Sequence, residues 1–280
     1  MAKEIGFMQG RLSDLVDGKI QAFPWKSWRD EFIISRDIGI SLMEWTLDQD
    51  YLYQNPLMTL DGQQEILYLS KCYDLAIPSL TGDCFMQAPF WKSKGVEQSE
   101  LIKDFFSIAR ACSKLGIQLI IIPLVDDGAI NSSKEEDFFV EFMVKYEDFF
   151  KAQGLRVAFE SDLPPKELGR FISRFPHHSF GINYDIGNSA SLGYNPVEEL
   201  STYGKRVVNV HVKDRLLGGT TVPLGSGNAD FNLVFLELAK IKYHGNYILQ
   251  TARSIDGDHA NLISQYFNSI SSLLVSSKAF

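Results

Sequence analysis

Three short apolar segments of the chain each end in a residue type that commonly binds metal ions. Glu160 follows residues 157–159, Asp185 ends the segment 180–185, and His211 follows residues 207–210. Carboxylate and imidazole groups at the ends of neighbouring strands are how a barrel enzyme holds a divalent cation. Asp185 follows Glu160 by 25 residues and His211 follows Asp185 by 26, close to one strand–helix unit each. The sequence therefore predicts one divalent metal ion at these three side chains, with Mn, Zn, Mg and Co all left open.

A fourth segment of the same kind, residues 247–249, ends in Gln250. An amide oxygen can bind a metal ion, so Gln250 is a fourth predicted ligand. Unlike a carboxylate, the amide carries no negative charge, so we expect a weaker metal site than a third carboxylate would give. The amide also cannot take up a proton, so Gln250 is not expected to act as an acid or base.

Eight apolar segments alternate with eight amphipathic segments along the chain. Most of the apolar segments are continuously apolar, which is typical of parallel strands covered on both faces. The predicted strands are 4–8, 42–44, 77–81, 118–123, 156–160, 180–185, 207–212 and 247–250. The predicted helices are 27–38, 62–73, 100–115, 135–152, 165–174, 196–203, 232–241 and 259–274. This alternation predicts an α/β fold, a (β/α)8 TIM barrel in which residues 1–280 form a single domain.

The irregular segments 9–24, 81–96 and 213–231 all follow predicted strands, which places them at the C-terminal face of the barrel. Barrel enzymes keep their chemistry in the loops at that face. We expect Glu44, at the end of the second strand, to bind substrate there. Asn188 either binds substrate hydroxyl groups or caps the following helix, and the sequence favours neither.

Three further cations lie near the glycine-rich stretch 223–231. Lys213 and Arg215 precede it, and Arg253 follows the last predicted strand. Glycines let backbone N–H groups approach a ligand closely, and the late loops of barrels often bind phosphate, although glycine-rich loops are also ordinary turns. We expect these three cations to bind substrate, which leaves a sugar and a sugar phosphate both open.

Composition excludes several other classes of protein. The formal net charge of −8 argues against a nucleic-acid partner, which normally meets a basic face. Three widely spaced cysteines form no C-x-x-C pair, so the chain is expected to contain free thiols and to be cytoplasmic. No long apolar stretch follows the first charged residues, so no signal peptide is expected, and no apolar run approaches the ~20 residues of a membrane span. A homo-oligomer is compatible with this composition.

Several motifs taken together resemble the xylose-isomerase-like TIM-barrel superfamily. They are Glu160, Asp185-Ile186-Gly187-Asn188, His211-Val212-Lys213-Asp214 and Pro223-Leu224-Gly225-x-Gly227-x-x-Asp230-Phe231. Within that superfamily, the chain resembles sugar-phosphate isomerases and epimerases of the L-ribulose/L-xylulose 5-phosphate 3-epimerase (hexulose-6-phosphate isomerase) kind. The resemblance implies a metal ion held by Glu160, Asp185, His211 and position 250. It also implies that Glu160 and position 250 form an acid/base pair.

These features predict a metal-dependent isomerase or epimerase of a sugar or sugar phosphate. Glu160 would remove a proton beside the carbonyl group, and the cation would stabilise the resulting enediolate. Inversion normally requires two acid/base groups, so the glutamine at position 250 places a two-glutamate epimerase mechanism in doubt. Glu44 or Asp83 would be a replacement on the opposite rim.

Three alternatives remain beside this prediction. A dehydratase or lyase on the same barrel would also begin with proton abstraction. A carbohydrate-binding protein that has lost turnover is favoured by Gln250. An apurinic-site endonuclease shares the barrel but needs many histidines, and this acidic chain has only five.

Overall fold

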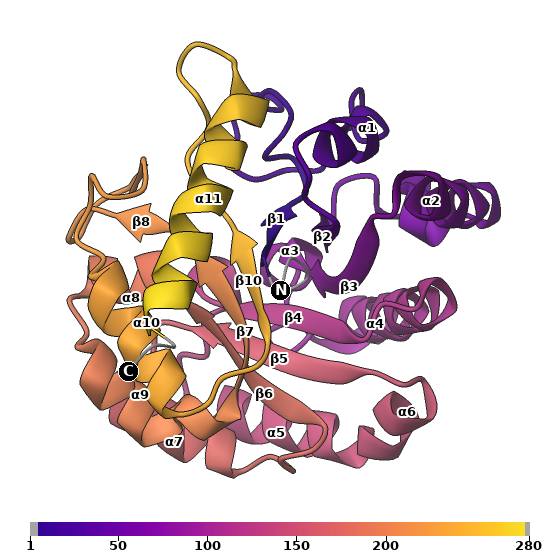
Figure 1. Cartoon of the computed structure of the whole chain (residues 1–280). Helices are drawn as coiled ribbons and strands as arrows, with labels where there is room; N and C mark the ends of the chain where they lie inside the picture. The colour runs from indigo at the N-terminus through magenta and orange to yellow at the C-terminus, as the bar shows by residue number, and fades with distance from the viewer. Residues whose placement is uncertain (1–4, 278–280) are drawn as a thin grey trace.

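The computed structural model describes residues 5–277, and its centre is a closed barrel of eight parallel strands surrounded by helices (Figure 1). The barrel strands are β1 (Ile5–Met8), β2 (Leu42–Thr46), β3 (Ala76–Thr81), β4 (Leu119–Leu124), β5 (Arg156–Ser161), β6 (Phe180–Asp185), β7 (Val207–Val212) and β10 (Asn246–Leu249). Neighbouring strands follow the order β1-β10-β7-β6-β5-β4-β3-β2 around the barrel. The predicted barrel is therefore confirmed, although Glu4, expected to begin the first strand, lies outside the described residues.

The helices pack around the outside of the barrel. They are α1 (Asp30–Asp37), α2 (Leu60–Tyr73), α3 (Asp83–Gln87), α4 (Gly95–Leu115), α5 (Ser133–Lys145), α6 (Glu147–Ala152), α7 (Pro165–Ser173), α8 (Ile186–Leu192), α9 (Pro196–Tyr203), α10 (Phe231–Lys240) and α11 (His259–Ser277). Gly116 follows α4 with a φ of +75°, a left-handed conformation that glycine adopts without strain. Such helix ends return the chain sharply to the next strand.

One predicted helix is divided in two. The sequence predicts a continuous helix over 135–152, but α5 ends at Lys145 and α6 begins at Glu147. Tyr146 leaves the helical conformation between them, with φ of −101° and ψ of 16°. Its ring lies 4.8 Å from the ring of Phe106 and 4.9 Å from that of Phe142. We infer that these tertiary contacts outweigh the amphipathic pattern that predicted one helix.

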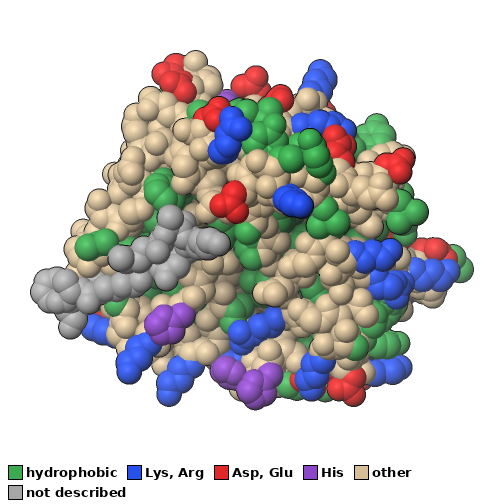
Figure 2. Space-filling model, turned by 45° about the vertical axis from the view of Figure 1, so that its right-hand side comes forward, with side chains coloured by type: hydrophobic (Ala, Val, Ile, Leu, Met, Phe, Trp, Pro, Cys, Tyr) green, Lys and Arg blue, Asp and Glu red, His purple; other side chains and the backbone are tan. Residues whose placement is uncertain are grey.

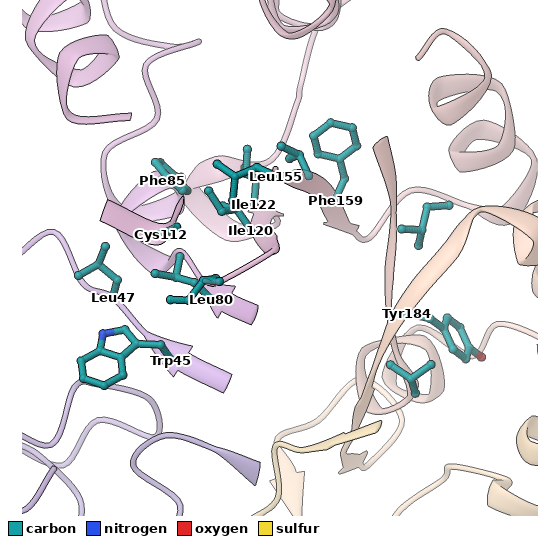
Figure 3. Close-up of a cluster of buried hydrophobic side chains, with 14 of the residues drawn as sticks. Trp45, Leu47, Leu80, Phe85, Cys112, Ile120, Ile122, Leu155, Phe159 and Tyr184 are labelled. Atoms are coloured by element: carbon teal, nitrogen blue, oxygen red, sulfur yellow. The ribbon is translucent and has the colours of Figure 1, made fainter. Parts of the chain in front are cut away.

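Strand residues alternate between the helix layer and the barrel interior, as the pleat of a strand requires. Outward-facing Ile120 and Ile122 of β4 pack in one buried cluster with Phe85 and Cys112 from the helices (Figure 3). Burial of each such large apolar side chain contributes about 1.5–3 kcal/mol. This outer layer fixes which strand positions point inward, and therefore which side chains reach the barrel mouth.

The barrel interior is apolar only in part. Met8, Leu42 and Ile248 form a small buried cluster separate from the outer core. Inward positions nearer the carboxyl ends of the strands are polar, and they include Glu44 and His211. A hydrogen-bonded interior of this kind can hold functional side chains in one orientation.

The segments 9–24, 81–96 and 213–231 follow the carboxyl ends of strands, as predicted, but the last two are not wholly irregular, because they contain a short helix and a short hairpin. Residues 9–29 follow β1, and α3 follows β3. A two-stranded hairpin of β8 (Asp214–Arg215) and β9 (Thr221–Val222) follows β7 and stands outside the barrel sheet (Figure 1). Among residues 5–277, no helix is long and apolar enough to cross a membrane. Acidic and basic side chains are interspersed with hydrophobic ones on the face in Figure 2.

Candidate metal centre and substrate cavity

The three predicted metal ligands converge at the carboxyl ends of adjacent strands. Glu160 comes from β5, Asp185 ends β6 and His211 comes from β7. All three side chains are buried, and each offers a ligand atom within 4.8 Å of those of the other two. The parallel register pairs Asp185 directly with His211. The strand ends therefore bring together a carboxylate–carboxylate–imidazole group that can hold a metal ion.

The ring of His211 is held in one orientation. Its Nε2 lies 2.7 Å from Glu44 Oε1, and its Nδ1 lies 3.2 Å from Glu160 Oε2 and 4.0 Å from Asp185 Oδ2. Burial alone would lower the pKa of His211, but the carboxylates of Glu44 and Glu160 outweigh burial and raise it to about 10. Donation from Nε2–H to Glu44 leaves Nδ1 facing the other two ligands, as in carboxylate–histidine–metal arrangements.

Glu44 lies inside the barrel and is fully buried. Its carboxylate accepts hydrogen bonds from Ser79 Oγ at 2.7 Å, Thr81 Oγ1 at 2.5 Å and Asn209 Nδ2 at 3.0 Å, beside the contact with His211. The expectation that Glu44 binds substrate does not agree with this placement, because its oxygens are used inside the barrel. The structure places it behind His211 instead.

Two amides fix the carboxylate of Glu160. Asn183 Nδ2 donates to Oε2 at 2.7 Å, and Asn188 Nδ2 donates to Oε1 at 2.9 Å. Burial would raise the pKa of Glu160, but the hydrogen bond and charge of His211 and the charge of Lys213 lower it below its ordinary value. Glu160 is therefore held ionised and is ready to accept a proton or bind a cation.

Asn188 does not cap the helix that it belongs to. Asp185 is the N-cap of α8, and its Oδ1 accepts the backbone N–H of Asn188 at 2.9 Å. The Asn188 side chain instead joins Glu160 to Arg215, whose Nη1 donates to Asn188 Oδ1 at 2.8 Å. Of the two roles that the sequence leaves open, capping is excluded, and Asn188 lines the cavity.

Lys213 and Arg215 also line the cavity, but both cations have partners within the chain. Lys213 Nζ lies 2.6 Å from Asp185 Oδ2, and Lys213 partly opposes the rise that burial causes in the pKa of Asp185. Arg215 donates to the carbonyl of Gly219 from Nε at 3.1 Å and from Nη2 at 2.8 Å. A Cβ atom at Gly187 would lie 2.8 Å from Lys213 Cγ, so glycine there leaves room for the lysine stem.

The glycine-rich loop binds a side chain of its own chain. Asp214 accepts the backbone N–H groups of Gly225 and Gly227 at 2.9 Å each and of Ala229 at 3.1 Å. A Cβ atom on Gly227 would overlap the Asp214 carboxylate, which explains the glycine. The sequence leaves open whether this loop binds phosphate or is an ordinary turn. In the structure, the three backbone N–H groups donate to Asp214.

Arg253 holds the segment that follows β1. Its Nε and Nη2 donate to the carbonyl of Gly10, at 3.1 and 2.6 Å, and Nε also reaches Ser13 O at 2.8 Å. Its Nη1 donates to Ile20 O at 2.6 Å. Arg253 was expected to bind substrate; in the structure its donors serve this loop, and substrate binding by Arg253 stays a prediction.

The fourth predicted ligand follows the barrel strand β10, which pairs directly with β7, the strand that carries His211. Gln250 follows β10, and its Nε2 donates to Gln21 Oε1 at 2.8 Å. Among the described residues, its buried Oε1 has no hydrogen-bond partner. Gln21 in turn donates from Nε2 to Asp83 Oδ2 at 2.8 Å. Burial and the charge of Asp48 raise the pKa of Asp83 to about 7.

Both groups of residues face one cavity of about 230 Å³. Glu160, Asn188 and Lys213 line one part of it, and Gln250 and Asp83 line another. The lining residues that were not predicted from the sequence include Arg11, Gln21 and Asp162. The first two lie in an irregular segment without periodicity, and an acid just after a strand, such as Asp162, is usually a solvated loop residue.

The donor set fits a divalent cation. Two carboxylates and an imidazole are borderline-hard ligands suited to Zn, Mn or Co. The orphaned Oε1 of Gln250 is a further oxygen donor at the wall of the same cavity. A buried oxygen without a partner is unfavourable unless an ion, water or substrate completes it.

Comparisons with known proteins show which family the chain resembles. A family model described as a xylose isomerase-like TIM barrel matches residues 32–266. The comparison with curated proteins found no match. Among solved structures, a D-allulose 3-epimerase from Methylomonas sp. is similar with a TM-score of 0.76 and 15% identity, covering 97% of this chain and 98% of that one.

Two other solved structures are similar over nearly their whole length. A xylose isomerase domain protein from Planctomyces limnophilus has a TM-score of 0.74 and 15% identity, with 97% of this chain and 96% of that chain covered. The IOLI protein, solved with a bound zinc atom, has a TM-score of 0.75 and 14% identity, with 98% and 99% covered. The TM-scores and the coverage establish the shared fold, and the family match extends over most of the sequence. The chain belongs to the xylose isomerase-like TIM barrel family.

Proposed function

We propose that the protein is a divalent-metal-dependent isomerase or epimerase that acts on a sugar. The observation that carries the proposal is the convergence of the buried side chains of Glu160, Asp185 and His211, of which Glu160 lines a cavity of about 230 Å³. D-allulose 3-epimerase and D-psicose 3-epimerase are among the proteins with similar structures, and the IOLI protein binds zinc. These likenesses support an enzyme of this class.

Glu160, Asp185, His211 and the free Oε1 of Gln250 are the residues that would hold the cation. When bound, the ion would supply Lewis-acid stabilisation of negative charge that develops on substrate oxygens. Glu44 would keep His211 in the tautomer with a free Nδ1, because it accepts the Nε2 proton. Asp185 would also anchor the start of α8, so Asn188 keeps its position beside Glu160.

Glu160 is the proposed base. Its carboxylate is ionised, and amides from Asn183 and Asn188 hold both of its oxygens. A fixed base loses no rotational freedom when it removes a proton from the carbon beside the substrate carbonyl. Isomerisation would return that proton to a neighbouring carbon, whereas epimerisation would return a proton to the opposite face.

A neutral sugar suits the cavity better than a sugar phosphate. Lys213 is paired with Asp185, Arg215 with Asn188 and Gly219, and the loop amides with Asp214. A phosphate would have to displace these internal partners before it gained its own. An unphosphorylated ketose needs only hydroxyl partners, which carboxylates and amides provide. Kinetics with a ketose and its matched phosphate test this preference, and a lower KM for the phosphate would reverse it.

Hydrogen exchange with solvent tests the proposed reaction. The purified chain, loaded with Mn²⁺, Co²⁺ or Zn²⁺, is incubated in D₂O with a panel of ketoses and aldoses. We expect deuterium at the carbon beside the carbonyl for at least one sugar, detected by NMR, and loss of that exchange after metal removal by a chelator. Absence of exchange for every sugar in the metal-loaded protein would reject the proposal.

A catalytically inactive carbohydrate-binding protein is the second candidate, and Gln250 favours it. The amide there cannot transfer a proton, although a carboxylate at this position is what the family resemblance implies. Gln250→Glu separates the two candidates. Turnover that appears only in this variant would identify a degenerate enzyme, whereas an active wild-type protein that loses turnover in the variant would show that glutamine is functional.

A further inference from the structure

The cavity contains a carboxylate on the side where Gln250 cannot transfer protons. Asp83 is the first residue of α3, directly after β3, and lines the same cavity as Glu160. Around the barrel, β3 is two strands from β5, with β4 between them. A sugar in the cavity would therefore meet Glu160 and Asp83 from different directions.

Asp83 lies in the first turn of α3, where a carboxylate suits the positive end of the helix dipole, but it does not cap the helix through its side chain. No side-chain cap hydrogen bond occurs at the start of that helix. The Asp83 carboxylate instead accepts Gln21 Nε2 at 2.8 Å, and its side chain is only 6% exposed. A buried carboxylate at a cavity wall that does not cap its own helix requires another explanation.

Gln21 connects Asp83 to the position that carries glutamine. Its Oε1 accepts Gln250 Nε2 at 2.8 Å and Arg11 Nη2 at 3.0 Å, while its own Nε2 serves Asp83. The orientation of the Gln21 amide is thereby fixed by three partners. This bridge holds Asp83 at the wall shared with Gln250.

We propose that Asp83 is the second acid/base group of the reaction and transfers the proton that position 250 cannot. This inference rests on the proposed isomerase or epimerase function. Glu160 removes the proton beside the carbonyl, and the C–H electron pair forms the C=C bond of an enediolate intermediate while the carbonyl pair moves to oxygen. The carboxylic acid of Asp83 then gives its proton to the other face of that carbon, and the carbonyl re-forms. One proton is taken and one is given, so the step needs no oxidant or reductant.

The surroundings of Asp83 suit both protonation states. Asp48 and Glu160 face it with negative charge, and Arg11 faces it with positive charge. Burial is the largest cause that raises the pKa of Asp83 to about 7, and Asp48 adds to it, whereas Gln21 and Arg11 oppose it. An acid/base group works best with a pKa near the operating pH.

Asp83→Asn tests the inference through two separate readouts of one reaction. Inversion of an epimerisable ketose is expected to fall by about 10²–10⁴-fold. Exchange of deuterium into the starting sugar should persist, because Glu160 still removes and returns a proton on its own face. Metal content should be unchanged, and Asp83→Glu should restore part of the inversion. Circular dichroism establishes that each variant is folded.

An inversion rate in Asp83→Asn within threefold of the wild-type rate would overturn the proposed role of Asp83 but not the proposed function. Loss of both inversion and exchange in that variant, with the sugar supplied as either epimer, would also overturn it, because the Glu160 half-reaction should survive. Absence of exchange in the wild-type protein would instead reject the proposed function.

Gln21→Leu is a second test that leaves the carboxylate in place. Loss of the Gln21 hydrogen bond should raise the pKa of Asp83. In the direction in which Asp83 donates the proton, the reaction rate falls as the pH rises through the pKa of Asp83. The falling limb of the pH–rate profile should therefore move to higher pH in Gln21→Leu. A limb that stays in place would contradict the inference.

Discussion

The two sides of the cavity are built on different principles. On the side of β5, β6 and β7, the functional groups are strand residues that the barrel register brings together, as Asp185 and His211 show. On the side of β1, β3 and β10, they are loop residues joined by the Gln21 amide. The first side is set by backbone geometry that every barrel shares, and the second is set by side-chain contacts particular to this chain.

This difference suggests how such a barrel can change its chemistry. The metal-binding side tolerates little change, because each ligand is fixed by a strand and by interior partners such as Glu44. The opposite side can exchange a carboxylate at position 250 for one at position 83 without moving a strand. Disruption of each side should therefore have distinct consequences.

The largest effect is expected from Glu160→Gln on the metal-binding side. The amide keeps the shape of the side chain but cannot take up a proton. Solvent deuterium exchange into the sugar should fall by about 10²–10⁴-fold, measured by NMR in D₂O. A variant that exchanges within threefold of the wild-type rate would show that another group is the base.

Glu44→Gln tests how a residue inside the barrel supports the metal-binding side, and the change does not alter the cavity lining. The change removes the charge that orients His211 through Nε2. Partners of this kind typically contribute about 10–100-fold to metal affinity, so a loss of that size is expected by calorimetry. The matched control is Gln250→Leu on the other side, which should weaken binding less because it removes one neutral oxygen. The opposite order of the two losses would contradict the assignment.

Metal affinity should also depend on pH in a defined direction. The pKa of His211 is raised to about 10, so the ring carries a proton at neutral pH when no metal is bound. Metal binding at Nδ1 must release that proton, so affinity should rise with pH, by up to about tenfold per pH unit between pH 6 and 8. Calorimetry in buffers of different ionisation enthalpy measures the released proton, and pH-independent affinity would place the metal elsewhere.

The smallest effect is expected from Arg253→Ala on the loop side. The change removes the hydrogen bonds that Arg253 donates to the carbonyls of Gly10, Ser13 and Ile20, and the unfolding free energy should fall by about 1–3 kcal/mol. Metal affinity should remain within threefold, because no ligand is touched. Urea titration measures the unfolding free energy, and calorimetry measures the metal affinity. A stability unchanged by the substitution would show that the loop is held by other contacts, such as the hydrogen bonds that Glu31 Oε1 accepts from the backbone N–H groups of Gly10 and Leu12.

The sequence predicts the metal-binding side well for a physical reason. Glu160, Asp185 and His211 end strands, and strand ends of a parallel barrel must meet at one rim. The same alternation could have revealed Asn183 and Asn209, because each lies two residues before a predicted ligand and points to the same side of its strand.

The other side could not be predicted from local patterns. Gln21 lies in an irregular segment. The side-chain amide of Gln21 bonds to Asp83 and Gln250, which are 62 and 229 residues away along the chain. The internal partners of Glu44 and Arg253 could not be predicted for a similar reason: the sequence places both residues near the mouth but does not show which groups their side chains contact. Only the three-dimensional arrangement distinguishes a cation that faces substrate from one that holds a loop.

Metal stoichiometry tests the central claim most directly. Purified protein is stripped with a chelator and titrated with Mn²⁺, Co²⁺ or Zn²⁺ in a calorimeter, beside an Asp185→Asn variant whose folding is checked by circular dichroism. We predict one ion per wild-type chain and at least a tenfold weaker site in the variant. Absence of binding in the wild-type protein, or equal binding by both proteins, would contradict a metal centre formed by Glu160, Asp185 and His211.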